Sequence, residues 1–193
     1  MSENCVLSHV TKEYLEEYQR IFDEMRRGMR KACLTDSISG NFIRQMIPHH
    51  QGAINMSRNI LKYTTCIPLQ EIALGIISEQ IKSIEDMKKA LPCCQMLRNS
   101  SQELCEYQKN MGQIMEIMFE GMENACANNE VSDNFMREMI PHHEGAVRMS
   151  KNALKHSICR QLHPILEAII ESQEKGICQM KQLLQEGSCS CGK

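Results

Sequence analysis

Residues 46–57 read Met-Ile-Pro-His-His-Gln-Gly-Ala-Ile-Asn-Met-Ser, and residues 139–150 read Met-Ile-Pro-His-His-Glu-Gly-Ala-Val-Arg-Met-Ser. The second stretch lies 93 residues after the first, and the match continues on both sides without a gap. Residues 13–91 and 106–184 agree at 35 of 79 positions. An insertion inside a helix would rotate every later side chain by about 100°. The unbroken register therefore predicts two copies of one structural unit.

Sulfur and imidazole side chains are retained between the copies more fully than other residue types. Each Met, Cys and His in this window of the first copy recurs in the second: Met25, Met29, Cys33, Met46, His49, His50, Met56, Cys66 and Met87. Their counterparts are Met118, Met122, Cys126, Met139, His142, His143, Met149, Cys159 and Met180. Thioether, thiol and imidazole groups are ligands for soft metal ions. The pattern therefore predicts a soft-metal site in each copy.

Composition and hydrophobic spacing predict an all-α protein of two similar helical bundles. Tryptophan is absent, aromatic residues make up 4 %, and the chain has 15 Met, so Ile, Leu, Met and Ala must build the core. We assign the first repeat to residues 1–97 and the second to residues 98–193. Apolar residues at helical spacing predict three helices per repeat. Their ranges are 11–33, 39–62 and 68–91, then 101–126, 132–156 and 162–185, with Ser39 and Ser132 as caps of the second helix in each set.

Several classes of function find no support in the sequence. A net charge of −2 and a pI near 6.4 argue against binding to nucleic acid. No apolar run approaches the roughly 20 residues that span a bilayer. The start, Met1-Ser2-Glu3-Asn4-Cys5, lacks a basic segment followed by an apolar one, so we expect a cytoplasmic protein whose 11 Cys are reduced thiols. No nucleophile with an orienting base, phosphate loop or acid pair is visible, so we expect no enzyme.

The first motif places its ligand-type side chains on one face of a helix. With Met46 at zero, His50 lies at about +40°, His49 at about −60° and Met56 at about −80°. The preceding helix adds Met25, Met29 and Cys33 at i, i+4 and i+8, and the following helix adds Met87. Three helices facing inward would bring sulfur and imidazole together.

Ligand softness predicts which metal is bound. Neutral thioether sulfur suits Cu(I) and also Ag(I), and is a poor ligand for Mg, Mn or Fe. Zinc sites use Cys or His pairs at closed spacing such as Cys-x-x-Cys, and di-iron bundles use Glu-x-x-His, and the sequence contains neither pattern. Methionine at helical spacing also fills cores. Met111, Met115 and Met136 fit that alternative, because they align with Tyr18, Phe22 and Ile43.

Further cysteines lie outside the repeat. Cys93, Cys94 and Met96 stand near the junction of the two copies, and the chain ends with a Cys189-Ser190-Cys191 tail. The tail is compatible with a thiolate clip for a soft metal and equally with a solvated terminus. Cys66 and Cys159 fall near helix ends, which is typical of packing or accessory thiols.

The pattern Phe-x-x-x-Met-Ile-Pro-His-His-x-Gly-Ala-x-x-Met-Ser, followed by Ile-Ile-x-x-Gln-x-x-x-Ile-x-x-Met, resembles the ferritin-like CopM family (domain of unknown function 305). It occupies residues 42–57 with 76–87 and residues 135–150 with 169–180. The resemblance implies four-helix-bundle-like domains and binding of copper or silver ions by Met and His in metal resistance. The family often has Glu where this chain has Ser83 and Gly176.

Together these observations predict a protein that binds Cu(I), or Ag(I), for buffering, storage or tolerance. A homo-oligomer or a copper-delivery partner is compatible with this interpretation. Three alternatives stay open: a cytosolic store in which cysteines carry the copper, a thiol-redox or metal-sensing protein, and a structural helical bundle that binds other proteins.

Overall fold

The computed structural model describes residues 6–187, which form six helices and no strand. The all-α prediction is confirmed, and the helices fall into two sets of three as the repeat requires. None of the helices in this range is long and apolar enough to cross a membrane. Their bounds are α1 His9–Arg30, α2 Ile38–Ile60, α3 Ile67–Cys94, α4 Ser101–Glu123, α5 Val131–Ala153 and α6 His163–Glu186.

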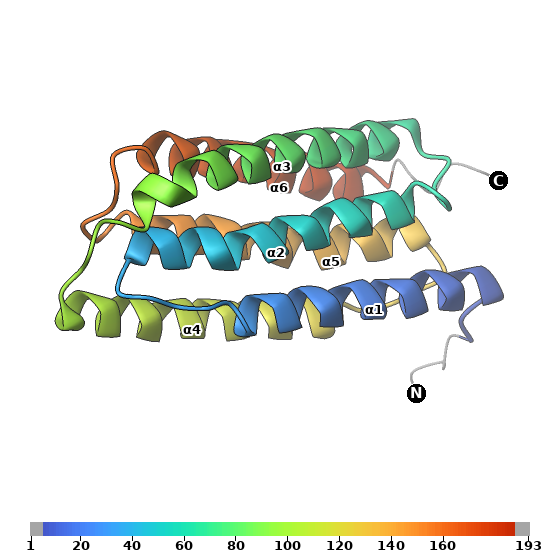
Figure 1. The fold of residues 1–193 in the computed structure, drawn as a ribbon. Coiled ribbons are helices and arrows are strands. Elements are labelled where there is room, and N and C mark those ends of the chain that lie inside the picture. The colour runs from blue at the N-terminus through green and yellow to red at the C-terminus, as the bar shows by residue number, and fades with distance from the viewer. Residues whose placement is uncertain (1–5, 188–193) are drawn as a thin grey trace.

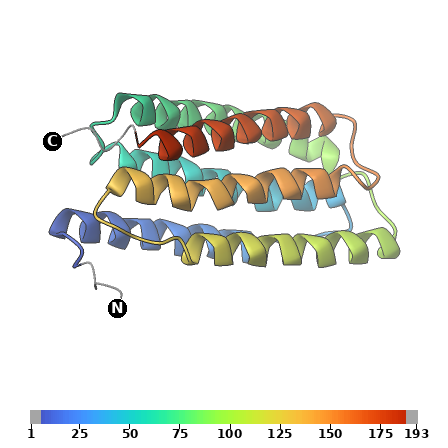
Figure 2. The same cartoon turned by 180° about the vertical axis from the view of Figure 1, so that it is seen from behind.

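The helices are stacked in three layers (Figure 1). Helices α2 and α5 form the middle layer, with α3 and α6 on one side and α1 and α4 on the other. The view from behind shows the same order (Figure 2). Within each half the second helix packs on the other two, and the halves meet through α2 with α5 and α3 with α6. The buried apolar side chains of both halves belong to one core.

Side chains at the outer layer join the two halves. The rings of Phe22 on α1 and Phe119 on α4 meet edge to face with centroids 6.0 Å apart. Beside them Arg26 pairs with Glu123, and Arg30 pairs with Glu116 at 2.8 Å. These contacts cover apolar surface that a separate half would leave in water.

The predicted caps Ser39 and Ser132 are wrong. Helix α2 begins one residue earlier, and Ser37 caps it because its extended backbone lets Oγ accept the Gly40 amide at 3.2 Å. The Ser39 hydroxyl accepts the Cys159 amide of the other half at 2.9 Å. Ser132 likewise pairs with the Thr64 hydroxyl at 2.9 Å. Both serines therefore connect the repeats.

Two glycines let α1 and α2 approach closely. A Cβ on Gly28 would lie 2.8 Å from Cβ of Pro48, and a Cβ on Gly52 would lie 2.6 Å from the Met25 sulfur. Pro48, which lies inside α2, thus fits against a residue without a side chain. The Gly52 contact places the Met25 sulfur on the backbone of α2, one turn after His49.

Candidate metal centre

The two copies of the His-His motif meet at the centre of the molecule. The rings of His49 and His142 stack with centroids 3.7 Å apart and an interplanar angle of 27°. His49 Nε2 lies 3.2 Å from the His142 carbonyl oxygen, and His142 Nε2 lies 3.2 Å from the His49 carbonyl oxygen. Both side chains are fully buried. The repeats thus share one centre, which the sequence did not predict.

These hydrogen bonds define the tautomer of both rings. A carbonyl oxygen only accepts, so each Nε2 carries the hydrogen and each Nδ1 keeps its lone pair. Both Nδ1 atoms are buried and have no hydrogen-bond partner within residues 6–187. Burial lowers the pKa of His142 to about 4 and that of His49 well below its ordinary value. At neutral pH both rings are therefore neutral, and a neutral imidazole nitrogen is a metal ligand.

The outer histidine of each pair is also buried, but the two environments differ. His50 Nε2 lies 3.0 Å from the hydroxyl of Ser83 on α3. At the matching place on α6 stands Gly176, so His143 has no such hydroxyl. Burial lowers the pKa of His50 to about 3, with the charge of His142 as a second cause, and burial lowers that of His143 well below its ordinary value. All four rings are ready to bind a metal without losing a proton.

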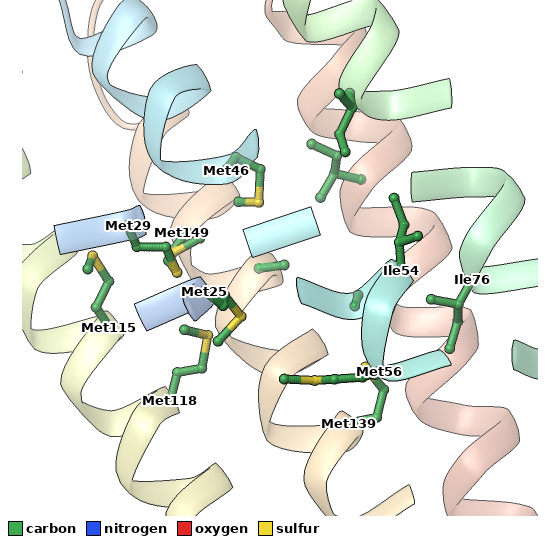
Figure 3. Close-up of a cluster of buried hydrophobic side chains, with 14 of the residues drawn as sticks. Met25, Met29, Met46, Ile54, Met56, Ile76, Met115, Met118, Met139 and Met149 are labelled. Atoms are coloured by element: carbon green, nitrogen blue, oxygen red, sulfur yellow. The ribbon is translucent and has the colours of Figure 1, made fainter. Parts of the chain in front are cut away.

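Buried methionines of both halves belong to the same core as this centre. Figure 3 shows a buried cluster with methionines of both halves, among them Met25, Met46, Met118 and Met139. Met115, which the sequence suggested as core filler, belongs to it and accepts a hydrogen bond from Gln45 Nε2 at 3.5 Å. All ten candidate methionines are at most 2 % exposed: Met25, Met29, Met46, Met56, Met87, Met118, Met122, Met139, Met149 and Met180.

Cys33 and Cys126 are not brought to the methionines. Helix α1 ends at Arg30 and α4 at Glu123, earlier than predicted, so the i, i+4, i+8 spacing does not continue to the cysteine. Both thiols are exposed. Any metal role for them concerns the surface.

Three other thiols lie together where α3 ends near the start of α6. Cys93 and Cys94 both hydrogen-bond to the sulfur of Cys159. Burial raises the pKa of Cys94 to about 12. The pKa of Cys159 is lowered, because hydrogen bonds from Cys94 and from the Gln161 and Leu162 amides outweigh the effect of burial. The adjacent Cys93 and Cys94 were the one hint of this cluster in the sequence.

The expectation that every cysteine is a free thiol is wrong. Cys66 is disulfide-bonded. Seven others in the described range are free. The predicted Cys189-Ser190-Cys191 clip lies outside the described residues.

The donor set also restricts which chemistry the core can perform. Within residues 6–187, His, Cys, Asp and Glu side chains alone form no group of three that could hold a metal ion. Thioether sulfur is the other donor type that the core contains, in its buried methionines. Such a mixed set favours a soft ion.

A family model described as a domain of unknown function (DUF305) matches residues 22–91 and 39–184 of the chain. The chain belongs to the DUF305 family. No curated protein matches it in sequence.

Two solved structures are similar to this DUF305 protein. One is CopM in the Cu(II)-bound form, with 28 % identity, a TM-score of 0.57, and coverage of 77 % of this chain and 97 % of CopM. The other is a DUF305 fragment from Deinococcus radiodurans, with 22 % identity, a TM-score of 0.56, and coverage of 77 % and 96 %. The second supports the fold, and the first links that fold to a copper-bound protein.

Proposed function

We propose that this DUF305 protein binds copper as Cu(I), and Ag(I) by the same chemistry, in its buried core. Its role is buffering, storage or tolerance, without catalysis. The ligands are imidazole nitrogens of His49, His50, His142 and His143 and thioether sulfurs of the motif methionines Met46, Met56, Met139 and Met149. The sulfurs of Met25, Met29, Met87, Met118, Met122 and Met180 lie in the same core and complete the donor set.

The observation that carries the proposal is the pair of stacked rings with free lone pairs. An imidazole nitrogen buried without a partner costs free energy, of the order of 1–3 kcal/mol per unsatisfied polar group. The Nδ1 atoms of His49 and His142 both lack a partner in the described part of the chain. A bound metal ion would satisfy them.

The surroundings of those nitrogens support Cu(I) as the bound oxidation state. Neutral donors in an apolar core favour the ion of lower charge, because burying a charge is costly. Soft sulfur adds a preference for Cu(I) over Cu(II). The related CopM was seen with Cu(II), so both states have to be titrated.

An anaerobic Cu(I) titration against a competing chelator tests the proposal. The Met46→Leu/Met139→Leu double variant keeps side-chain volume, so the fold should stay within about 1.5 kcal/mol of the parent for each change. We expect its Cu(I) affinity to fall by about tenfold or more, which is ~1.4 kcal/mol. Met96→Leu is the matched control, because Met96 is 76 % exposed, and it should bind like the parent.

The second candidate is a cysteine-based copper store, which the contact of Cys93, Cys94 and Cys159 favours. Alkylation with iodoacetamide separates the two, because mild alkylation at neutral pH blocks thiols and leaves imidazole and thioether free. We expect alkylated protein to keep its tight Cu(I) sites. If alkylation abolishes binding and the double variant binds like the parent, copper is held by the cysteines.

A further inference from the structure

Two pockets related by the internal repeat lie between α3 and α6. The larger-volume pocket, about 400 Å³, includes Ser83, Ile165 and Ala168 in its wall. The other, about 360 Å³, includes the matching residues Gly176, Ile72 and Gly75. Each pocket has room for several water molecules. They differ in what lies at the inner end.

Only one of these pockets reaches a histidine of the centre. Ser83 closes the first against His50, because its hydroxyl lies 3.0 Å from His50 Nε2. In the second, a Cβ on Gly176 would lie 3.0 Å from His143 Cδ2 and 3.1 Å from Nε2. No side chain of residues 6–187 takes that place, and His143 lines the pocket.

The wall of the His143 pocket suits a cation. Two carboxylates of α3, Glu71 and Glu79, line it, with Lys175 of α6 opposite. His143 itself is only 1 % exposed, and its Nδ1 has no hydrogen-bond partner in the described residues. A buried imidazole at the inner end of a pocket lined by carboxylates can take a metal ion from water.

We propose that the pocket lined by Gly176 is the entrance through which a copper ion reaches the buried centre, with His143 as its first inner ligand. The identity of the ion rests on the proposed function. The matching pocket at Ser83 is closed, so the copper ion enters through one half of the molecule and not through the other. The ion enters beside the second His-His motif and passes from there to the ring pair at the centre.

Chemical modification of the metal-free protein tests access without copper. Diethyl pyrocarbonate acylates accessible neutral imidazoles, and peptide mass spectrometry locates the product. We expect modification of His143 and not of His50. Gly176→Ser should protect His143, and Ser83→Gly should expose His50. Equal reactivity of His143 and His50 in the parent would overturn the proposal, and exposed His9 serves as the internal control for the reagent.

Copper loading then tests the route. In anaerobic stopped-flow mixing with Cu(I), we expect Gly176→Ser to slow loading by about tenfold while the final stoichiometry stays that of the parent. Gly75→Leu narrows the same pocket at a position where a Cβ meets no atom within 4 Å, so it gives the same test if Gly176→Ser folds poorly. Gly112→Ala on exposed α4 is the control, because its Cβ also meets no atom.

The outcomes separate the entrance from the function. Unchanged loading rates in both pocket variants, with normal capacity, would reject the entrance and leave copper binding intact. Protein that binds no Cu(I) at all would reject the proposed function, while the acylation pattern would still report whether the pocket leads to His143.

Discussion

At the scale of single residues, the unusual feature is a group of four buried histidines at the centre of the molecule. Burial is the first cause of the lowered pKa of each ring, and neighbouring imidazoles lower three of them further. In most proteins a buried imidazole is fully hydrogen-bonded. Here every Nδ1 is without a partner in the described range, as expected of a site whose partner is a ligand.

We predict that the metal-free protein loses stability steeply on acidification. The folded pKa is about 3 for His50 and about 4 for His142, whereas an unfolded His titrates near 6.5. Below pH ~6.5 the unfolded chain therefore takes up protons that the folded chain does not, and stability falls as pH falls towards the folded pKa. Each ring lowers the free energy of unfolding by up to about 1.4 kcal/mol for every pH unit of acidification in this range.

One carboxyl opposes this trend. Burial raises the pKa of Glu138 to about 8 against the hydrogen bond from Tyr14, so its contribution to stability is lost as pH rises through that value. Glu138 accounts for one proton and the histidines for four, so the effect of the histidines on stability is the larger one. Urea unfolding at pH 7.5, 6 and 5 measures how the free energy of unfolding changes with pH. His50→Gln should make this change smaller. A free energy of unfolding that stays constant down to pH 5 would show that the rings are not buried as described.

At the scale of helices, the glycines of α1 and α2 decide how near the sulfur of α1 comes to the motif. Gly28 faces Pro48 and Gly52 faces Met25, and the second half repeats both contacts through Gly121 and Gly145. The Gly in the His-His-x-Gly motif is thus explained by packing of the preceding helix. This packing puts a thioether next to the histidine turn.

Gly52→Ala should destabilise the protein by about 1–3 kcal/mol, because the new Cβ would lie 2.6 Å from the Met25 sulfur and force it away. Gly112→Ala is the matched control: with nothing within 4 Å of its Cβ, it should stabilise the helix by up to about 1 kcal/mol. Thermal and urea unfolding of both variants measure the difference. Equal stabilisation by the two changes would disprove the close approach.

The sequence predicted the helices and their buried faces correctly, but it predicted the wrong caps and helix ends. The register of Met46, His49, His50 and Met56 is local to one helix, so periodicity predicted their shared face. Whether Ser39 caps its own helix or pairs with Cys159 depends on a neighbour 120 residues away. Local spacing holds no information on such contacts. For the same reason the stack of His49 on His142 could not be predicted from the sequence.

At the scale of the whole molecule, two similar but unequal halves share one core. The ring stack and the paired carbonyl contacts are symmetric. The exchange of Ser83 for Gly176 and of Gln45 for Glu138 breaks that symmetry next to the centre. A single tandem chain allows each half to specialise, which a symmetric dimer of identical chains does not.

Our last prediction concerns the independence of the halves. A fragment of residues 1–97 would lack His142 against His49, Phe119 against Phe22 and Glu116 against Arg30, and would expose the buried face of α2. We therefore expect it to be unfolded or self-associated, and never a folded monomer. Mixing it with residues 98–193 should restore a one-to-one complex, as seen by circular dichroism and light scattering.

The control is the full chain cut once in the connection between α3 and α4. Its two pieces are made together and retain every contact between the halves, so it should unfold at nearly the same urea concentration as the parent. A monomeric 1–97 fragment with its own cooperative transition would contradict the single core, because the free energy of burying α2 against α5 would then not be needed for folding. In that case the stack of His49 on His142 would be only a contact between two independently folded domains.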